Sequence, residues 1–288
     1  MYRLFSDVTA DVSTEMMAGL PEVKMLSMAV EIGDREYLYG PDGNLSVAEF
    51  YALQRAGAFA STSQLTPQAL IDAFTPTLSA GVDVLYLCFS SGLSGTWQSA
   101  QLARDALRNQ YPRRKVICVD TLCASVGQGF LVREAAKKQA EGLDIDALAA
   151  WVERRKLSVC HWFTVDGFDH LRHGGRVSGA AAAIGTVLNI KPLLHVDEAG
   201  KLVITQKPRG PKMAMSAQIA HMREGWEPDL GNLVVIGHAD SPEAAHTLAD
   251  RVLVEFPNAD IHFADIGPVI GAHVGPGMLA LIYWGRNR

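Results

Sequence analysis

Residues 82–96, VDVLYLCFSSGLSGT, hold the pattern that decides the fold of this chain. The first eight residues are almost continuously apolar, which is typical of a strand buried on both faces of a parallel sheet. The next seven are serines, glycines, a threonine and one leucine, and a helix is expected from there to about Asn109. A strand that runs into a helix in this way is half of a β-α-β unit, so we expect a parallel sheet.

The same alternation of strands and helices continues on both sides of that stretch. Ser46 and Glu49 form a capping box, in which each side chain satisfies an amide at the start of a helix over 47–55. Thr66 before Pro67 predicts a second helix start, with threonine as the cap and proline at the first helical position. Further elements expected in this half are a strand at 116–119 and helices at 126–140 and 144–156.

The second half of the chain mixes hairpin and helix signals. Residues 197–200, DEAG, predict a hairpin between strands at 190–196 and 201–206. Other elements expected here are strands at 159–165, 233–237, 261–264 and 278–284, and helices at 179–187, 211–223 and 242–254. The chain is therefore predicted to be α/β, with one domain at 1–157 built on a mostly parallel sheet and a second at 158–288 built on a mixed sheet.

Composition and charge exclude several classes of function. The 288 residues are 48% hydrophobic, with a mean hydropathy of +0.08, which excludes a disordered chain. With 26 basic and 31 acidic residues the net charge is −5, so the basic surface of a nucleic-acid-binding protein is missing. No apolar run approaches the roughly 20 residues that span a bilayer, and no signal peptide is expected. Four scattered cysteines fit a reducing cytoplasm.

Residues 90–96 are the first candidate for a binding site. Ligands of open α/β sheets bind at the carboxyl ends of the strands, where a helix N-terminus offers free N–H groups to an anion. Ser94 and Thr96 add neutral hydroxyl donors, and no lysine is present, so this is not the phosphate loop of a nucleotide-binding protein. These donors suit a carboxylate or a single phosphate. The alternative is an ordinary turn with a serine cap.

A rival hypothesis makes Ser94 a nucleophile. Residues 92–95 follow the G-x-S-x-G nucleophile elbow, but Thr96 stands where the motif requires glycine. With His273 as base and Asp240 or Asp265 as the acid, the chain would be a serine esterase or thioesterase.

Two further segments carry chemistry-bearing residues. In 173–178, HGGRVS, Arg176 suits a carboxylate or phosphate clamp, and the alternative is an ion pair with Asp169. A phosphate-ligand binder using Arg176 is therefore a third hypothesis. In 267–277, GPVIGAHVGPG, two internal prolines predict a loop that presents His273 to a ligand.

Metal and nucleotide cofactors are not expected. His170 and His173 lie three residues apart near Asp166 and Asp169, but this is no recognised metal-ligand spacing. Residues 127–129, GQG, lack the third glycine of the dinucleotide fingerprint.

Several segments in order along the chain together resemble the DegV family of fatty-acid-binding proteins. The sequence departs from the usual family pattern at two places. Residues 6–9 read SDVT in place of the usual T-D-S-[TS], and Leu65 stands where the family often has proline. The matching segments are 62–64 (TSQ), 90–96 (SSGLSGT), 127–129 (GQG), 171–178 (LRHGGRVS), 190–194 (IKPLL), 207–210 (KPRG) and 270–277 (IGAHVGPG).

The resemblance implies a long-chain fatty acid, such as palmitate or oleate, bound between two α/β domains. Its carboxylate would be held by the hydroxyls of Thr62 and Ser94, with His273 at the same polar end. Supporting positions would be Ser63, Gly95, Thr96 and Gly271, and head-group or partner-facing positions would be Arg176 and Arg209.

The resemblance also implies a role without catalysis by this chain. Some members of the family serve a fatty acid kinase, which phosphorylates the bound carboxylate, and the acyl phosphate then enters phospholipid synthesis. We therefore expect a cytoplasmic binding protein of fatty acid metabolism, without catalytic residues, cofactor, nucleic-acid partner or stable membrane insertion, and with a fatty acid kinase as its protein partner.

Overall fold

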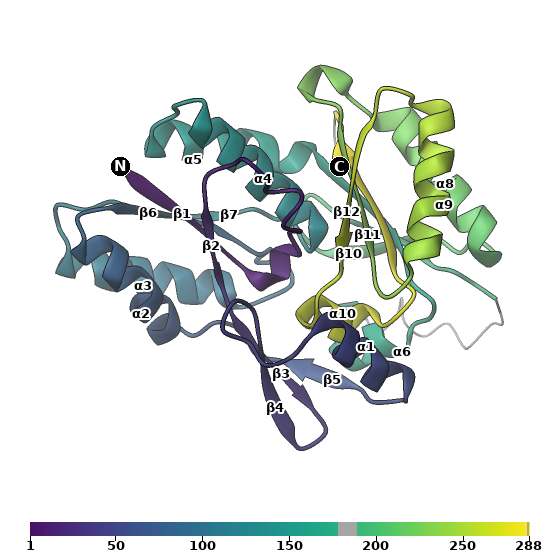
Figure 1. Cartoon of the computed structure of the whole chain (residues 1–288), viewed down its shortest axis with the longest axis horizontal. Helices are drawn as coiled ribbons and strands as arrows, with labels where there is room; N and C mark the ends of the chain where they lie inside the picture. Colours follow the sequence, from purple (N-terminus) through teal and green to yellow (C-terminus); the bar gives the residue numbers. More distant parts are fainter. Residues whose placement is uncertain (178–188, 287) are drawn as a thin grey trace.

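A computed structural model describes residues 1–177, 189–286 and 288 of the chain. These residues form a mixed α/β structure in which three sheets are surrounded by helices (Figure 1). The strands are β1 (Tyr2–Asp7), β2 (Val23–Leu26), β3 (Met28–Ile32), β4 (Arg35–Tyr39), β5 (Ala60–Thr62), β6 (Asp83–Cys88), β7 (Val116–Asp120), β8 (Val159–Thr164), β9 (Leu193–Val196), β10 (Leu202–Gln206), β11 (Leu233–His238), β12 (Asp260–Asp265) and β13 (Leu279–Trp284).

The helices match most of the sequence predictions. The Ser46 and Thr66 side chains accept the amides of Glu49 and Ala69, as the capping patterns predict. The helices are α1 (Val47–Arg55), α2 (Pro67–Ser79), α3 (Thr96–Gln110), α4 (Val126–Ala140), α5 (Ile145–Arg155), α6 (Asp169–Gly174), α8 (Gly210–Gly225), α9 (Pro242–Glu255) and α10 (Pro268–Val274), with short 3-10 turns η1 (Val8–Ala10), η2 (Lys156–Ser158) and η3 (Pro228–Leu230).

The first sheet is parallel, as predicted from residues 82–96. Its strand order is β2-β1-β6-β7, and all three pairings are parallel. Helices α2 and α3 lie on one side of it, and α4 and α5 lie on the other (Figure 1). The strand that opens the decisive stretch, β6, is central and buried, which explains its nearly continuous apolar sequence.

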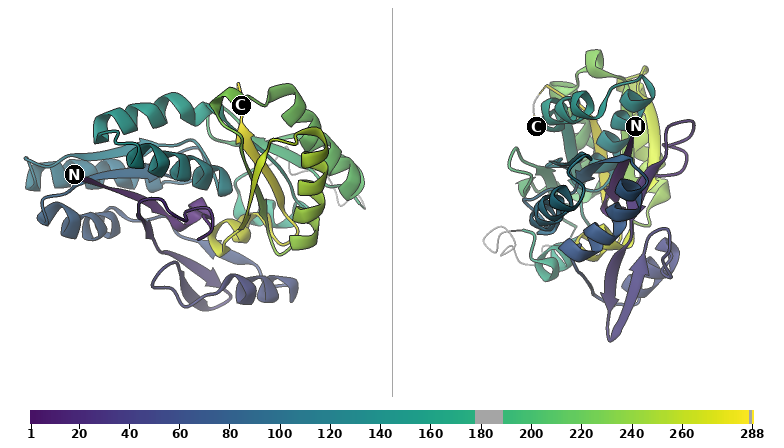
Figure 2. Two further views of the ribbon diagram at one scale, coloured as in Figure 1. Left: turned by 45° about the horizontal axis from the view of Figure 1, so that its top comes forward. Right: turned by 90° about the vertical axis from the view of Figure 1, so that its left-hand side faces the viewer.

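The second sheet is mixed and has six strands in the order β10-β9-β8-β13-β11-β12. Only β11 and β12 pair in parallel, and the predicted hairpin is the antiparallel pair β9 and β10. Helix α4 contacts β8, β11 and β13 on one face of this sheet. Helices α8 and α9 contact the opposite face of the sheet (Figure 2). Helix α4 therefore lies between the two large sheets and belongs to the core of both.

A third, antiparallel sheet of order β4-β3-β5 was not predicted from the sequence. It projects below the two large sheets together with α1 (Figure 1). Its strand β5 ends at Thr62, in a segment for which no strand is expected from the sequence. The strand forms because residues 60–62 pair with β3, a contact with a segment about thirty positions away that local pattern does not reveal.

The predicted loop at 267–277 is wrong in part, because α10 occupies its centre. Pro268 stands at the start of the helix, where proline lacks only an amide that would be unpaired anyway. Pro276 follows the helix end and does not interrupt it. The predicted helix at 179–187 and Ser178 lie outside the described residues.

One continuous apolar core joins the parallel sheet, α4 and the inner face of the mixed sheet. A second cluster lies between the mixed sheet and the helices α8 and α9. Over residues 1–177 and 189–286, no helix combines the length and the hydropathy needed to cross a bilayer.

Candidate ligand-binding site

A pocket opens where the three sheets meet, next to the turn that follows β6. It holds about 840 Å³ of empty space, a figure that includes its open mouth. Its walls are mostly apolar. The lining residues are Thr9, Met28, Thr62, Ser63, Gln64, Phe89, Leu93, Ser94, Thr96, Ala124, Ser125, Val126, His161, Phe163, Arg176, Val196, Leu202, Val269, Ile270, His273, Val274, Met278, Ala280 and Ile282.

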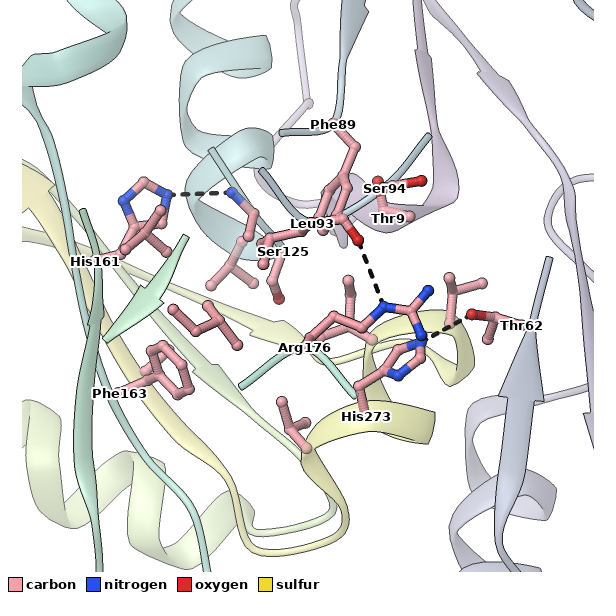
Figure 3. A pocket seen from close by; sticks show the side chains of 18 of the residues that line it. Thr9, Thr62, Phe89, Leu93, Ser94, Ser125, His161, Phe163, Arg176 and His273 are labelled. Carbon is pink, nitrogen blue, oxygen red and sulfur yellow. Dashed lines mark hydrogen bonds between the residues drawn. The ribbon is translucent and has the colours of Figure 1, made fainter. Parts of the chain in front are cut away.

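Thr62 and His273 meet at one end of this pocket. Thr62 stands at the end of β5 and His273 on α10, and Thr62 Oγ1 lies 2.8 Å from His273 Nε2 (Figure 3). Burial lowers the pKa of His273 to about 4, with further contributions from the charges of Arg176 and His173. The imidazole is therefore neutral at physiological pH and acts as a hydrogen-bonding group.

The Ser94 hydroxyl is held by its own turn. Ser94 Oγ accepts the Thr96 amide at 3.2 Å and lies 3.0 Å from Thr96 Oγ1. Thr96 Oγ1 in turn accepts the amide of Leu65 at 3.3 Å. When Thr96 donates its hydroxyl proton to Ser94, the hydroxyl proton of Ser94 is left over for a ligand in the pocket.

The segments around Thr62 and Ser94 are fastened to each other. Besides the Leu65 contact, Gln64 Nε2 donates to Ser99 Oγ on α3 at 3.3 Å. The Gln64 side chain lies so close to Gly95 that a Cβ atom there would come within 1.9 Å of Gln64 Oε1. The structure thus brings residues 62–64 next to the 90–96 turn.

Arg176 also reaches the pocket. Its Nε donates to the carbonyl of Leu93 at 3.4 Å (Figure 3). Its Nη1 donates to the carbonyl of Gly174. The alternative of an ion pair with Asp169 is wrong, because Asp169 pairs with Arg172 at 2.6 Å. The Arg176 side chain is exposed, with no carboxylate partner within the described residues, so its charge is available at the mouth of the pocket.

Two residues predicted for the site lie elsewhere. Arg209 precedes α8, is exposed and does not line the pocket. Gly271 faces α1 instead: its carbonyl accepts Gln54 Nε2 at 3.1 Å, and a Cβ atom would come within 2.6 Å of the Phe50 ring. Gly271 is therefore a packing glycine between α10 and α1. Ser63 and Thr96 line the pocket as expected, whereas Gly95 does not and instead packs against the Gln64 side chain.

The catalytic triad of the esterase hypothesis is not assembled. His273 contacts Thr62 and not Ser94, and its Nδ1 atom has no hydrogen-bond partner in the described part of the chain. Asp240 pairs with Arg55, and Asp265 lies 3.5 Å from His238 Nδ1. No acid therefore orients the histidine toward a serine nucleophile, as a triad requires.

Several lining residues were missed by sequence reasoning. His161 and Phe163 lie on β8, and their alternate spacing places both on one face of that strand. Thr9 lies in the 3-10 turn after β1, and Ser125 immediately precedes α4. Both residues also line the pocket. The alternation in 160–163 was the available signal, but it does not say which face meets a pocket. Among the described residues no cluster of three or more His, Cys, Asp or Glu side chains could hold a metal.

Fold and site together define a two-domain α/β protein with an apolar pocket that is polar at one end. The chain matches the family described as uncharacterised protein, DegV family, over residues 2–286, and it belongs to that family. It is 39% identical over 287 residues to a DegV domain-containing protein of Clostridium perfringens, covering 100% of this chain and 98% of the relative.

Solved structures share the fold over the whole chain. One described as fatty acid binding of a DegV family protein from Thermus thermophilus has a TM-score of 0.85 at 29% identity and covers 99% of both chains. The Streptococcus pneumoniae Fatty Acid Kinase (Fak) B3 protein loaded with linoleic acid has a TM-score of 0.87 and covers 99% of both chains. At 20% identity this second likeness shows the fold alone.

Proposed function

We propose that this chain binds a long-chain fatty acid, with the carboxylate at Thr62, Ser94 and His273 and the acyl chain in the apolar part of the pocket. The observation that carries the proposal is the pairing of a mostly apolar pocket with a group of neutral donors at one end. The fatty acid binding of the Thermus thermophilus protein, which shares the fold at 29% identity, supports the same ligand class.

The proposed head-group site works without a buried cation in direct contact. In the tautomer with a proton on Nε2, His273 donates to Thr62 Oγ1, which leaves the Thr62 hydroxyl proton for the ligand. When the Thr96 hydroxyl donates to Ser94, whose oxygen also accepts the Thr96 amide, the Ser94 proton is likewise free for the ligand. Two preset hydroxyl donors stabilise a carboxylate withdrawn from water through charge-assisted hydrogen bonds. Arg176 supports them from the pocket mouth.

The acyl chain supplies most of the binding free energy in this proposal. Burial of each methylene contributes about 0.8 kcal/mol, so about fifteen of them contribute roughly 12 kcal/mol before the costs of ordering the chain. Such a ligand stays bound through purification. The apolar side chains available for this contact include Phe89, Leu93, Val269 and Ile282.

Lipid extraction of the purified protein, followed by mass spectrometry, tests the proposal. We expect a long-chain fatty acid in near-stoichiometric amount, and uptake of palmitate or oleate by delipidated protein. Ser94→Ala should weaken binding by roughly tenfold or more, because one hydrogen bond to a charged group is lost. Ser91→Ala is the matched control, since Ser91 shares the turn but does not line the pocket. A folded protein that takes up no fatty acid would refute the proposal.

We further propose that the bound fatty acid is presented to a fatty acid kinase, with this chain as a binding subunit and not the enzyme. The support is the family to which the chain belongs, together with Arg209, which is exposed and outside the pocket. Acyl-phosphate formation by a purified fatty acid kinase is the assay. Arg209→Ala should slow that reaction and leave fatty acid affinity unchanged, while Arg113→Ala, at another exposed arginine, should do neither.

The domain boundary and the cellular location belong to the same proposal. We place the boundary near residue 157, between α5 and β8, where the chain passes from the parallel sheet to the mixed sheet. A cytoplasmic location agrees with four buried cysteines that form no disulfide. Limited proteolysis would test the domain boundary, and fractionation of the source cells would test the cellular location.

A further inference from the structure

The turn that carries Ser94 is fastened to the mixed sheet at a point outside the pocket. The contact joins residues 90–96, here called the head-group turn, to residues 197–200 between β9 and β10, here called the hairpin turn. Ser90 is 0% exposed and does not line the pocket. Its hydroxyl donates to the carbonyl of Gly200 at 2.7 Å, so one buried hydrogen bond connects two turns that are 110 positions apart in the chain.

The two turns fit closely because both supply a glycine. A Cβ atom on Gly92 would come within 2.6 Å of the carbonyl oxygen of Ala199, and one on Gly200 would come within 2.1 Å of Ser90 Oγ. Real Cβ atoms essentially never approach other atoms below 3.0 Å, so a larger residue at either position would push the turns apart. The head-group turn therefore rests directly on the backbone of the hairpin turn.

The hairpin turn is itself held in place by Arg288. The Arg288 guanidinium donates to the carbonyl of Asp197 in the hairpin turn at 3.2 Å. It also donates to the carbonyls of Lys156 at 2.7 Å and Val159 at 3.0 Å, which belong to η2 and β8. A single side chain thus ties the hairpin turn to the body of the protein, which makes the turn a fixed support for Ser90.

Ser90 also organises the head-group turn from within. Its carbonyl accepts the amides of Leu93 at 3.1 Å and Ser94 at 3.2 Å. Its Oγ accepts the amide of Gly92 at 3.2 Å, while the hydroxyl proton leaves the turn for Gly200. Because the Ser94 backbone is bonded directly to Ser90, a movement of Ser90 is passed on to Ser94.

Resting on the proposed function, we infer that Ser90 is a positioning residue for the fatty acid carboxylate: it fixes the Ser94 hydroxyl by anchoring the head-group turn to the hairpin turn. A charge-assisted hydrogen bond weakens steeply when its distance or angle changes, so Ser94 depends on this anchor. Burial of the acyl chain is non-directional and makes no such demand. Loss of the Ser90 hydroxyl therefore reduces the preference for a carboxylate and spares the affinity for the chain.

The test measures the affinities of delipidated protein for palmitic acid and for hexadecanol, which has the same chain length and no charge, by displacement of a fluorescent fatty acid. The readout is the ratio of the two affinities. We expect Ser90→Ala to lower this ratio about three- to tenfold through weaker acid binding, with the hexadecanol affinity changed by less than about twofold. Gly92→Ala, which keeps the Ser90 hydroxyl but forces the turns apart, should lower the ratio in the same way.

Ser6→Ala is the matched control. Ser6 is likewise 0% exposed, donates to the carbonyl of Leu87 at 2.9 Å and accepts Gln128 Nε2 at 3.1 Å. The substitution therefore removes the same number of hydrogen bonds from a buried serine, but on a strand of the parallel sheet and away from both turns. Both variants should lose stability in urea unfolding, whereas Ser6→Ala should keep the wild-type affinity ratio.

The outcomes separate the two proposals. A wild-type ratio in folded Ser90→Ala would overturn the inference and leave fatty acid binding intact. An equal fall of the ratio in Ser6→Ala would also overturn it, because general loosening of the core would then explain the effect. Failure of the wild-type protein to bind palmitic acid would instead refute the proposed function. If Ser90→Ala does not fold, the ratio in Gly92→Ala decides.

Discussion

Gly174→Ala should damage fatty acid binding through a residue that touches no ligand. Gly174 ends α6, and a Cβ atom at this position would lie 2.3 Å from His273 Nδ1 and 3.1 Å from its Cγ. Ordinary contacts of a Cβ atom begin near 3.4 Å, so the imidazole would have to move by about 1 Å. The backbone of Gly174 is helical, so alanine brings no conformational strain of its own.

The displacement falls on the bond that orients Thr62. His273 Nε2 lies 2.8 Å from Thr62 Oγ1, and a shift of about 1 Å either compresses or breaks this hydrogen bond. Loss of one hydrogen bond at a charged ligand costs about 1.5–3 kcal/mol, which weakens affinity roughly tenfold to a hundredfold. The same overpacking should lower the free energy of unfolding by about 1–3 kcal/mol.

Displacement of a fluorescent fatty acid measures the affinity, and urea unfolding measures the stability. Gly167→Ala is the matched control: it is a glycine of the same segment, without a positive φ, and a Cβ atom there would have nothing within 4 Å. Wild-type affinity and stability in Gly174→Ala would refute the argument that this glycine exists to seat His273. Equal losses in the two variants would show that the segment, and not the histidine contact, is responsible.

Two other predictions concern buried hydrogen-bonding groups. The pKa of His273 is about 4 in the folded protein and near 6.5 in the unfolded chain, so the unfolded chain binds the proton more tightly. The free energy of unfolding therefore falls as the pH decreases from 6.5 towards 4, and the loss reaches about 2 kcal/mol near pH 5. Urea unfolding of wild type and His273→Gln near pH 7 and pH 5 checks this, and equal losses in both would contradict it. Tyr51→Phe removes the 2.8 Å hydrogen bond to the Ile266 carbonyl and should lower the free energy of unfolding by about 1–2 kcal/mol without changing fatty acid affinity. Tyr37→Phe is the control and should not show this loss, because Tyr37 is less buried. Thermal unfolding with and without palmitate would show whether the Tyr51 effect stays confined to stability.

Much of the fold could be predicted because its signals are local. The helix starts at Ser46 and Thr66 depend on side chains that satisfy amides within three residues, and those bonds form in the structure. The strand β6 could be predicted because its nearly continuous apolar sequence is typical of a strand that is buried on both faces. The prediction failed at α10, where the position of Pro268 relative to the helix start, and not its presence, decided the outcome.

The site could be predicted only in part for the same reason. The hydroxyl residues of 62–64 and 90–96 are visible as motifs, but their meeting depends on the pairing of β5 with β3 and on the bond between Leu65 and Thr96. The inner wall at His161 carries no motif, because its character comes from which face of β8 meets α4.

The sequence by itself determined the α/β class, most helix boundaries and the neutral hydroxyl chemistry at Ser94, since these follow from contacts between residues close together in the chain. The tertiary structure alone decided that Thr62, Ser94 and His273 share one pocket, that Gly271 and Arg209 stand outside it, and that His161 closes its far side. The physical reason is that the pocket is formed by three sheets whose packing brings together residues as far apart in the chain as Thr9 and Ile282. Only burial and hydrogen bonding between such residues fix what each side chain faces.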